Sequence, residues 1–96
     1  MPRKYPPLTP REIVAILQAR GFAQEHTRGS HAYHVSTIRG KRRCVTVDMA
    51  YREFSVDRIK DMIDQSGLTR VEFYGSTKRT AKKINLRASG HPIPLE

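Results

Sequence analysis

Several residue types are scarce in this 96-residue chain, and each shortage excludes something. Tryptophan is absent, and the single cysteine, Cys44, excludes an internal disulfide bond and fits a reducing compartment. Because Cys44 lies in a run typical of a strand, we expect a small buried side chain there. The longest apolar run, residues 13–17, is far shorter than the roughly 20 residues that cross a bilayer. Residues 1–7 contain no apolar stretch of signal-peptide length, so we expect a cytoplasmic protein.

Negative charge is also scarce, because 9 Asp and Glu residues stand against 18 Lys and Arg residues, for a net charge of +9. The positive residues form two clusters. One surrounds Gly40, and the other runs from Lys78 to Arg87 with no acid between. Such clusters favour a surface that binds phosphate, although a solvated face kept for solubility is the alternative. Neither cluster carries an aromatic-rich apolar face, which argues against membrane attachment.

Residues 8–21 carry the start and stop signals of a helix. Thr9 is expected to cap it, with Pro10 at the first helical position and Glu12 completing a capping box. The apolar residues 13, 16 and 17 recur at helical spacing and predict the buried face. Gly21 can take the left-handed conformation that ends the helix.

The hydrophobic period then changes to alternation, which predicts strands over residues 22–28, 31–38 and 42–47. The turns Gly29-Ser30 and Arg39-Gly40-Lys41 are short, so the strands should form an antiparallel meander. Ser55 is expected to cap a second helix that ends at Ser66-Gly67, with an apolar face formed by Val56, Ile59, Met62 and Ile63.

The same opening pattern recurs at residues 68–73 and predicts a short third helix that Gly75 ends. The order α-β-β-β-α predicts a small α+β domain over residues 1–75, with a three-stranded antiparallel sheet covered on one face by two helices. Residues 76–96 form a basic C-terminal extension. Residues 77–85 are compatible with a helix, but cations in its first turns oppose the helix dipole. We expect this extension to dock loosely or to be ordered by a partner, with a flexible end beyond Arg87.

Thr27-Arg28-Gly29-Ser30-His31 is the most informative stretch, because its turn presents a histidine at the start of a strand. Metal-free RNA cleavage can use the neighbouring 2′-hydroxyl as nucleophile, which needs a base near that proton and positive charge near the phosphate. His31 is our candidate general acid/base. Arg28, Lys41, Arg42 and Arg43 are expected to supply the charge, if the two hairpin loops approach one groove.

Other uses of these side chains are weaker. His31 and His34 are three residues apart, which places them on opposite faces of a strand, so no metal site is predicted. Ser30 is expected to form the turn or to hydrogen-bond a phosphate rather than to act as a nucleophile. Tyr33 shares the strand face of His31 and is a weak candidate for the missing second proton carrier. The acids, including Asp48, are interpreted as turn, capping and helix-surface residues. The alternative for His31 itself is an ordinary surface histidine in a turn.

The chain resembles the HicA toxins of bacterial HicA–HicB toxin–antitoxin modules over residues 8–68. The resemblance rests on four segments in order, namely Ala19-Arg20-Gly21-Phe22, Gly29-Ser30-His31, Arg43-Cys44-Val45-Thr46-Val47 and residues 59–68. Each motif is short, but their order and spacing together are fairly specific. The chain departs from the family at Ala32, at Ser55-Val56 and in its long basic tail.

The resemblance implies a double-stranded-RNA-binding-domain-like (dsRBD-like) fold and an endoribonuclease that cleaves single-stranded messenger RNA without metal or small-molecule cofactor. It places His31 at the family's essential histidine and implies a HicB-type antitoxin as protein partner. The expected RNA-binding residues are Arg28, Gly29, Ser30, Lys41, Arg42, Arg43, Lys78, Arg79, Lys82 and Lys83. A non-catalytic RNA-binding module of the same fold is the main alternative, and a DNA-binding or purely partner-binding protein is the third.

Overall fold

The computed structural model describes residues 3–96, so the first two residues of the predicted 1–75 domain lie outside it. The chain forms a small α+β fold in the predicted α-β-β-β-α order, followed by two short helices. The elements are α1 (Pro10–Ala19), β1 (Ala23–Arg28), β2 (His31–Ile38), β3 (Lys41–Asp48), α2 (Val56–Ser66), α3 (Arg70–Tyr74) and α4 (Lys78–Lys82).

The sheet is antiparallel with the order β1-β2-β3, as its short connections predict. The pairs Arg28↔His31 and Ile38↔Lys41 close two-residue turns at the two ends of β2. Both residues of the second turn, Arg39 and Gly40, have positive φ angles (51° and 79°), as a type I′ turn requires. The predicted turn was therefore one residue too long, and β3 begins at Lys41 rather than Arg42.

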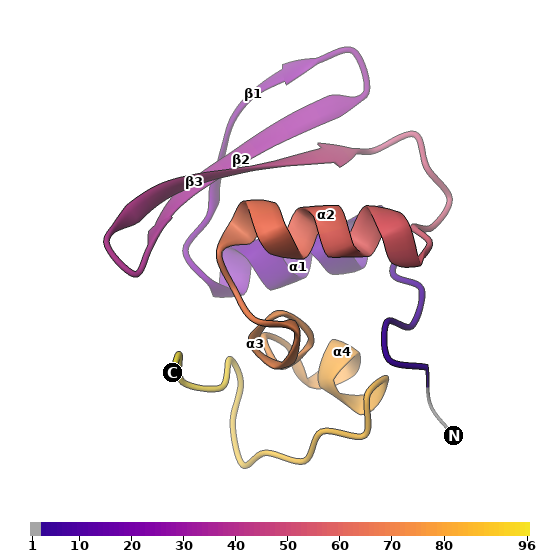
Figure 1. The fold of residues 1–96 in the computed structure, drawn as a ribbon. Coiled ribbons are helices and arrows are strands. Elements are labelled where there is room, and N and C mark those ends of the chain that lie inside the picture. Colours follow the sequence, from indigo (N-terminus) through magenta and orange to yellow (C-terminus); the bar gives the residue numbers. More distant parts are fainter. Residues whose placement is uncertain (1–2) are drawn as a thin grey trace.

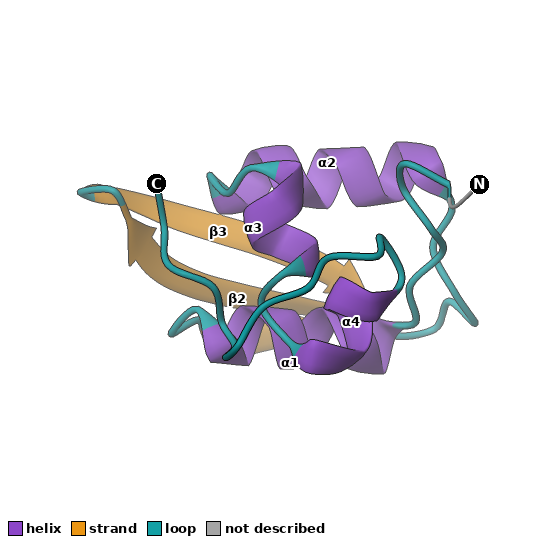
Figure 2. Cartoon of the chain, turned by 90° about the horizontal axis from the view of Figure 1, so that it is seen from below, coloured by secondary structure: helices purple, strands orange, loops and turns teal. Residues whose placement is uncertain are grey.

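The molecule has three layers (Figure 1). The sheet lies on one side of α1 and α2, and α3 and α4 lie on the other side of that helix pair. In the view from below, α3 lies across the pair and α4 lies beside α1 (Figure 2). The two main helices thus cover one face of the sheet, as predicted, and no helix within residues 3–96 covers the other face.

Alternation along the strands decides which side chains enter the core. Val45 and Val47 point toward the helices and are fully buried, which directs Cys44 to the bare face. Cys44 is exposed, so its predicted burial was wrong. Val56 was also misplaced, because it is 43% exposed at the first turn of α2. The core cluster consists of Leu8, Ile13, Ile16, Leu17, Phe22, Ile38, Val45, Val47, Phe54, Ile59, Met62, Ile63, Leu68, Phe73 and Tyr74.

Capping boxes start both α1 and α3. Thr9 and Glu12 exchange hydrogen bonds between side chain and backbone at 2.9 and 3.1 Å, which confirms the predicted box. Thr69 and Glu72 form the second box at 2.8 and 3.2 Å. Both glutamates are buried, with 6% and 1% of their surface exposed, so each carboxylate needs a cationic partner as well as its cap.

For Glu12, the partners come from the C-terminal extension. Lys83 Nζ lies 3.0 Å from Glu12 Oε1 and also donates to the carbonyl of Pro7 at 2.8 Å. Arg79 Nε lies 3.2 Å from Glu12 Oε2. Thr80 and Ala81 of α4 are buried. The expectation of a loosely docked extension was therefore wrong, because sequence alone did not indicate that these cations meet a buried acid.

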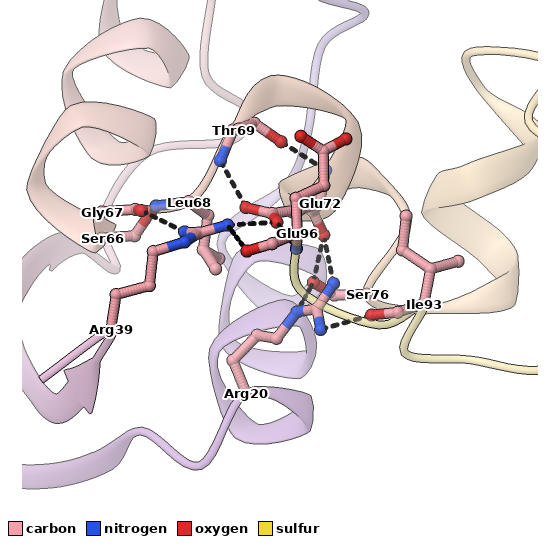
Figure 3. A network of polar contacts seen from close by, with 10 residues as sticks. All are labelled: Arg20, Arg39, Ser66, Gly67, Leu68, Thr69, Glu72, Ser76, Ile93 and Glu96. Carbon is pink, nitrogen blue, oxygen red and sulfur yellow. Dashed lines mark hydrogen bonds and ion pairs between the residues drawn. The ribbon is translucent and has the colours of Figure 1, made fainter.

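For Glu72, the partners are Arg39 of the β2–β3 turn and the last residue of the chain. Arg39 forms an ion pair with the Glu72 carboxylate, and the backbone N–H of Glu96 donates to it at 2.8 Å (Figure 3). Arg20, at the end of α1, donates to the Glu72 carbonyl at 2.8 Å and to the Ile93 carbonyl at 2.6 Å. These contacts hold the segment beyond Arg87 against the body, which corrects the predicted flexible end.

Candidate functional site

His31 is the first residue of β2, where the sheet ends and solvent begins. Its imidazole is 52% exposed, and its backbone pairs with Arg28 of β1 and Asp48 of β3. The Nε2 atom lies 3.5 Å from Asp48 Oδ2. At this separation the carboxylate stabilises an imidazolium electrostatically but does not form a short hydrogen bond to it. The expected exposure of His31 is confirmed.

Asp48 is held in place by two donors. The hydroxyl of Ser30 donates to its Oδ1 at 2.7 Å, and the backbone N–H of Ala50 donates to the same atom at 3.0 Å. The Ser30 hydrogen bond is the main reason that the pKa of Asp48 lies below its usual value, with the Ala50 bond second. Asp48 is therefore a carboxylate at neutral pH, and its charge favours a proton on the nearer nitrogen of His31. The other nitrogen, Nδ1, is then left with a free lone pair.

The interpretation of Asp48 as a simple turn residue was therefore incomplete, since it is the acid that faces the imidazole. The pairing His31↔Asp48 follows directly from a two-residue turn at Arg39-Gly40, whereas the three-residue loop of the prediction shifts the register by one position. Gly40 was the signal for a two-residue turn, because the second position of a type I′ turn favours glycine.

A small hollow of about 140 Å³ lies between this end of the sheet and α2. In its lining, the Gln65 side chain accepts a hydrogen bond from the Thr46 N–H at 3.1 Å, which satisfies part of the free edge of β3. One cation, Arg58, enters the lining, and its guanidinium lies 5.1 Å from the ring centre of Tyr51. The lining residues are His31, Thr46, Asp48, Phe54, Arg58, Asp61, Met62 and Gln65.

The cations nearest to His31 are not all those that the sequence predicted. Arg28 is its direct cross-strand neighbour, and Gly29, with a φ of +61°, forms the tight turn between them. Lys41 lies at the other end of the β2–β3 ladder, about 23 Å of strand from His31. The expectation that both hairpin loops approach one groove was wrong, because the two turns close opposite ends of β2.

The remaining hairpin cations have intramolecular neighbours. Arg42 lies 3.3 Å from Glu25 in an exposed pair. Arg43 is half-buried against Gly67, and its Nε atom is buried without a hydrogen-bond partner among residues 3–96. Of the predicted hairpin cluster, Lys41 and Arg42 thus remain exposed to solvent, and Arg43 faces the helix side.

An aromatic pair next to His31 escaped the sequence prediction. The rings of His26 and Tyr33 stack at 4.5 Å between centroids with an interplanar angle of 13°. They are cross-strand partners in β1 and β2, and Tyr33 shares the bare sheet face with His31 two residues away. Flat side chains exposed on a sheet are platforms on which unpaired bases stack. Cross-strand register, rather than spacing along the chain, creates this pair.

The four cations of the extension that were expected to bind RNA separate into two pairs. Arg79 and Lys83 are bound to Glu12. Lys78 and Lys82 are exposed, and both line a different cavity on the far side of the helix pair. These residues therefore do not surround His31.

No cluster of three or more His, Cys, Asp or Glu side chains in residues 3–96 is placed to hold a metal ion. None of the helices described in this part of the chain has the length and apolar character needed to cross a membrane. The arrangement around His31 offers proton transfer at the imidazole, positive charge from Arg28 and Arg58, and an aromatic surface beside them.

Comparisons with known proteins add no identification, since no family model, curated protein or solved structure matches this chain.

Proposed function

We propose that this protein is a metal-independent endoribonuclease of the HicA toxin type, with a dsRBD-like fold, which cleaves single-stranded messenger RNA in the cytoplasm. The observation that carries the proposal is the exposed His31 imidazole, 3.5 Å from a carboxylate that two hydrogen bonds hold in place. In the proposal, RNA binds to the bare sheet face. The resemblance of the Gly29-Ser30-His31 motif to the HicA toxins supports the assignment to that type of enzyme.

In this proposal, His31 Nδ1 takes the proton of a ribose 2′-hydroxyl. The 2′-oxygen then attacks the adjacent phosphorus, the bond to the 5′-oxygen breaks, and the products are a 2′,3′-cyclic phosphate and a 5′-hydroxyl. The leaving 5′-oxygen takes its proton from water or from a second side chain. Asp48 stabilises the imidazolium that forms. Arg28 and Arg58 offset the charge that develops on the phosphate oxygens.

The face around His31 also suits single-stranded rather than duplex RNA. The His26–Tyr33 stack accepts unpaired bases, which a duplex does not offer. Gly29 and Ser30 are small and allow the RNA backbone to approach closely. Lys41 and Arg42, at the far end of the sheet, are placed for further phosphate contacts. A HicB-type antitoxin would neutralise the protein by covering this face, with acidic groups that compete for the same cations.

The second candidate is an RNA-binding module without catalysis. The same aromatic stack favours it, because base stacking requires no proton transfer. His31 would then be one contact among several, and its loss would weaken binding modestly.

Wild type and His31→Ala separate these candidates. Both are incubated with single-stranded RNA in EDTA, and cleavage, RNA binding and the circular dichroism spectrum are measured in parallel, together with growth arrest on expression. We expect cleavage to fall by about 10²–10⁴-fold while binding and folding persist. His26→Ala is the matched control, which should weaken binding without abolishing the reaction. Equal cleavage by wild type and His31→Ala would remove His31 from the mechanism, and binding without cleavage by wild type would favour the second candidate.

A further inference from the structure

The helix α4 lies on the side of the helix pair that faces away from the sheet (Figure 1). Residues of α4 and of the chain after it line a second concave site. Its volume is about 750 Å³, within the range of small-ligand sites. The walls come from α4 and from the chain that follows it. The lining residues are Lys78, Lys82, Asn85, Leu86, Arg87, Ala88 and His91.

The cations of α4 and of its C-terminal cap, Lys83, point in two directions according to their helical spacing. Arg79 and Lys83, four residues apart, face the body and bind the buried Glu12. Lys78 and Lys82, also four residues apart, face the cavity, and Arg87 joins them from the following loop. Among residues 3–96 no carboxylate lies within ion-pair distance of these three cations. The cavity therefore concentrates positive charge that the protein itself does not neutralise.

The backbone holds this arrangement at both ends. Asn85 has a φ of +54°, and the N–H groups of Asn85 and Leu86 return to the carbonyls of Lys82 and Ala81 at 3.1 and 3.0 Å. This is a Schellman motif, which ends α4 and reverses the chain across it. The other end is fixed where the Ile93 N–H donates to the Gly75 carbonyl at 3.1 Å. The chain that lines the cavity is therefore held at both of its ends.

The chemistry of the lining indicates the ligand. Two ammonium groups and a guanidinium without an acid select an anion, and phosphate is the anion that Lys and Arg bind most commonly. Leu86 and Ala88 provide an apolar wall for a flat ring or a ribose. The Asn85 amide provides a donor and an acceptor for a heterocyclic base. This combination fits a whole nucleotide better than inorganic phosphate.

We propose that this cavity is a nucleotide-binding site, with the phosphate against Lys78, Lys82 and Arg87 and the nucleoside against Leu86 and Ala88. The nucleotide is either a free mononucleotide or one residue of an RNA strand. The site goes beyond the function proposed above, because it lies on the opposite side of the helix pair from His31 and does not depend on RNA cleavage.

The test uses the full chain and two probes, AMP and a short oligouridylate. Amide chemical shifts in a ¹⁵N-labelled sample are followed during titration, and affinities are measured by calorimetry. Lys78→Gln/Lys82→Gln removes the cavity ammonium groups. Arg52→Gln/Lys60→Gln is the matched control, with the same loss of charge at two exposed residues elsewhere. Because all four side chains are exposed, both double variants should fold like wild type and keep its amide spectrum away from the substituted residues.

We expect shifts at Lys82, Asn85, Ala88 and His91, and affinity at least about tenfold weaker in the cavity variant but within about twofold of wild type in the control. Saturable binding of AMP at these amides identifies a free nucleotide as a ligand. Shifts there with the oligouridylate alone identify an RNA residue. If neither probe shifts these amides, or if both double variants lose affinity equally, the site is refuted. Cleavage by wild type and His31→Ala is scored separately, so either proposal can fail alone.

Discussion

Lys83 Nζ lies 3.0 Å from Glu12 Oε1, although the two residues are 71 positions apart. This contact joins the C-terminal extension to the capping box of α1. Burial would raise the pKa of Glu12, but the Thr9 backbone hydrogen bond and the charges of Lys83 and Arg79 outweigh it and hold the pKa below its usual value. Extension and body therefore stabilise each other, and the division at residue 75 is not an energetic boundary.

Replacing Glu12 with Gln should destabilise the whole fold. The amide keeps the capping geometry but leaves the ammonium of Lys83, which is 32% exposed, without its anionic partner. We expect the free energy of unfolding to fall by about 1–3 kcal/mol in urea titrations. Glu25→Gln is the control, because it removes an exposed pair with Arg42 and should cost less than about 1 kcal/mol. Equal losses in the two variants would contradict the role of Glu12.

His34 should make stability depend on pH in mildly acidic solution. The side chain is 2% exposed, neither ring nitrogen has a hydrogen-bond partner among residues 3–96, and burial lowers the pKa of His34 from 6.5. Because the folded state disfavours the protonated ring, protonation favours the unfolded chain. Stability should be unaffected above pH 6.5 and should fall as the pH drops from 6.5 toward the folded-state pKa.

Urea titrations at several pH values test this expectation against His34→Leu, which removes the titrating group and fills the same space. The variant should show a flat profile in the window where wild type loses stability. The carboxylates with lowered pKa, Asp48, Glu12 and Glu72, contribute stability that is lost only at lower pH, below the usual carboxyl values. If wild type and His34→Leu lose stability equally between pH 6.5 and the usual carboxyl pKa values, a group other than His34 causes the loss.

Asp48→Asn should reduce RNA cleavage through the orientation of His31. The amide keeps the hydrogen-bond acceptor for Ser30 and Ala50 but removes the negative charge that faces Nε2. We expect kcat to fall by about 10- to 100-fold with KM nearly unchanged, a smaller loss than in His31→Ala. Asp57→Asn, on the exposed first turn of α2, is the charge-matched control. A loss confined to KM would make Asp48 a binding residue instead.

Tyr33 should contribute to RNA binding through its ring. Tyr33→Leu removes the partner of His26 and should weaken binding of single-stranded RNA by about 1–3 kcal/mol, measured by fluorescence anisotropy. Tyr33→Phe keeps the stack and should bind like wild type. The same variant tests the hydroxyl, because loss of cleavage with intact binding would assign Tyr33 as the second proton carrier. Unchanged binding by Tyr33→Leu would show that bases do not stack there.

Gly67→Ala should cost more stability than Gly40→Ala. Both glycines have φ near +75° (74° and 79°), so each substitution carries the left-handed penalty of about 1–2 kcal/mol. Only at Gly67 would the added Cβ lie 2.6 Å from Arg43 Nε, whereas nothing lies within 4 Å at Gly40. We expect an additional loss of about 1 kcal/mol in thermal unfolding, which Arg43→Ala should recover in the double variant. Equal costs at the two glycines would exclude the clash.

Structural features that a few neighbouring residues determine could be predicted from the sequence. The Thr9–Glu12 capping box needs only residues three apart, and the turn at Gly29-Ser30 places His31 at a strand start whatever the rest of the fold does. The helices and strands themselves were predicted for the same reason, because the spacing of apolar residues over a short window distinguishes the two. These local rules were enough to give the α-β-β-β-α order and the exposed histidine.

Features that depend on register or on distant pairing were not predictable. One residue of turn length between β2 and β3 decides whether His31 faces Asp48. The prediction that both cation clusters bind phosphate was wrong in part, because a run of Lys and Arg residues in the sequence does not reveal which of them form ion pairs with a buried acid. Arg39 meets Glu72, which is 33 positions away in the sequence, and Lys83 meets Glu12, which is 71 positions away. Only tertiary packing distinguishes such cations from those left for a ligand.

The outward turn of Cys44 provides a ready-made spectroscopic probe. As the chain's only thiol, it reacts with a maleimide fluorophore at one position, next to Val35 in the middle of the uncovered β-surface. A dye there would report an oligonucleotide or antitoxin arriving over the strands, while occupation of the pocket behind α4 would leave its emission unchanged. A single labelled sample can therefore assign each ligand to one side of the molecule.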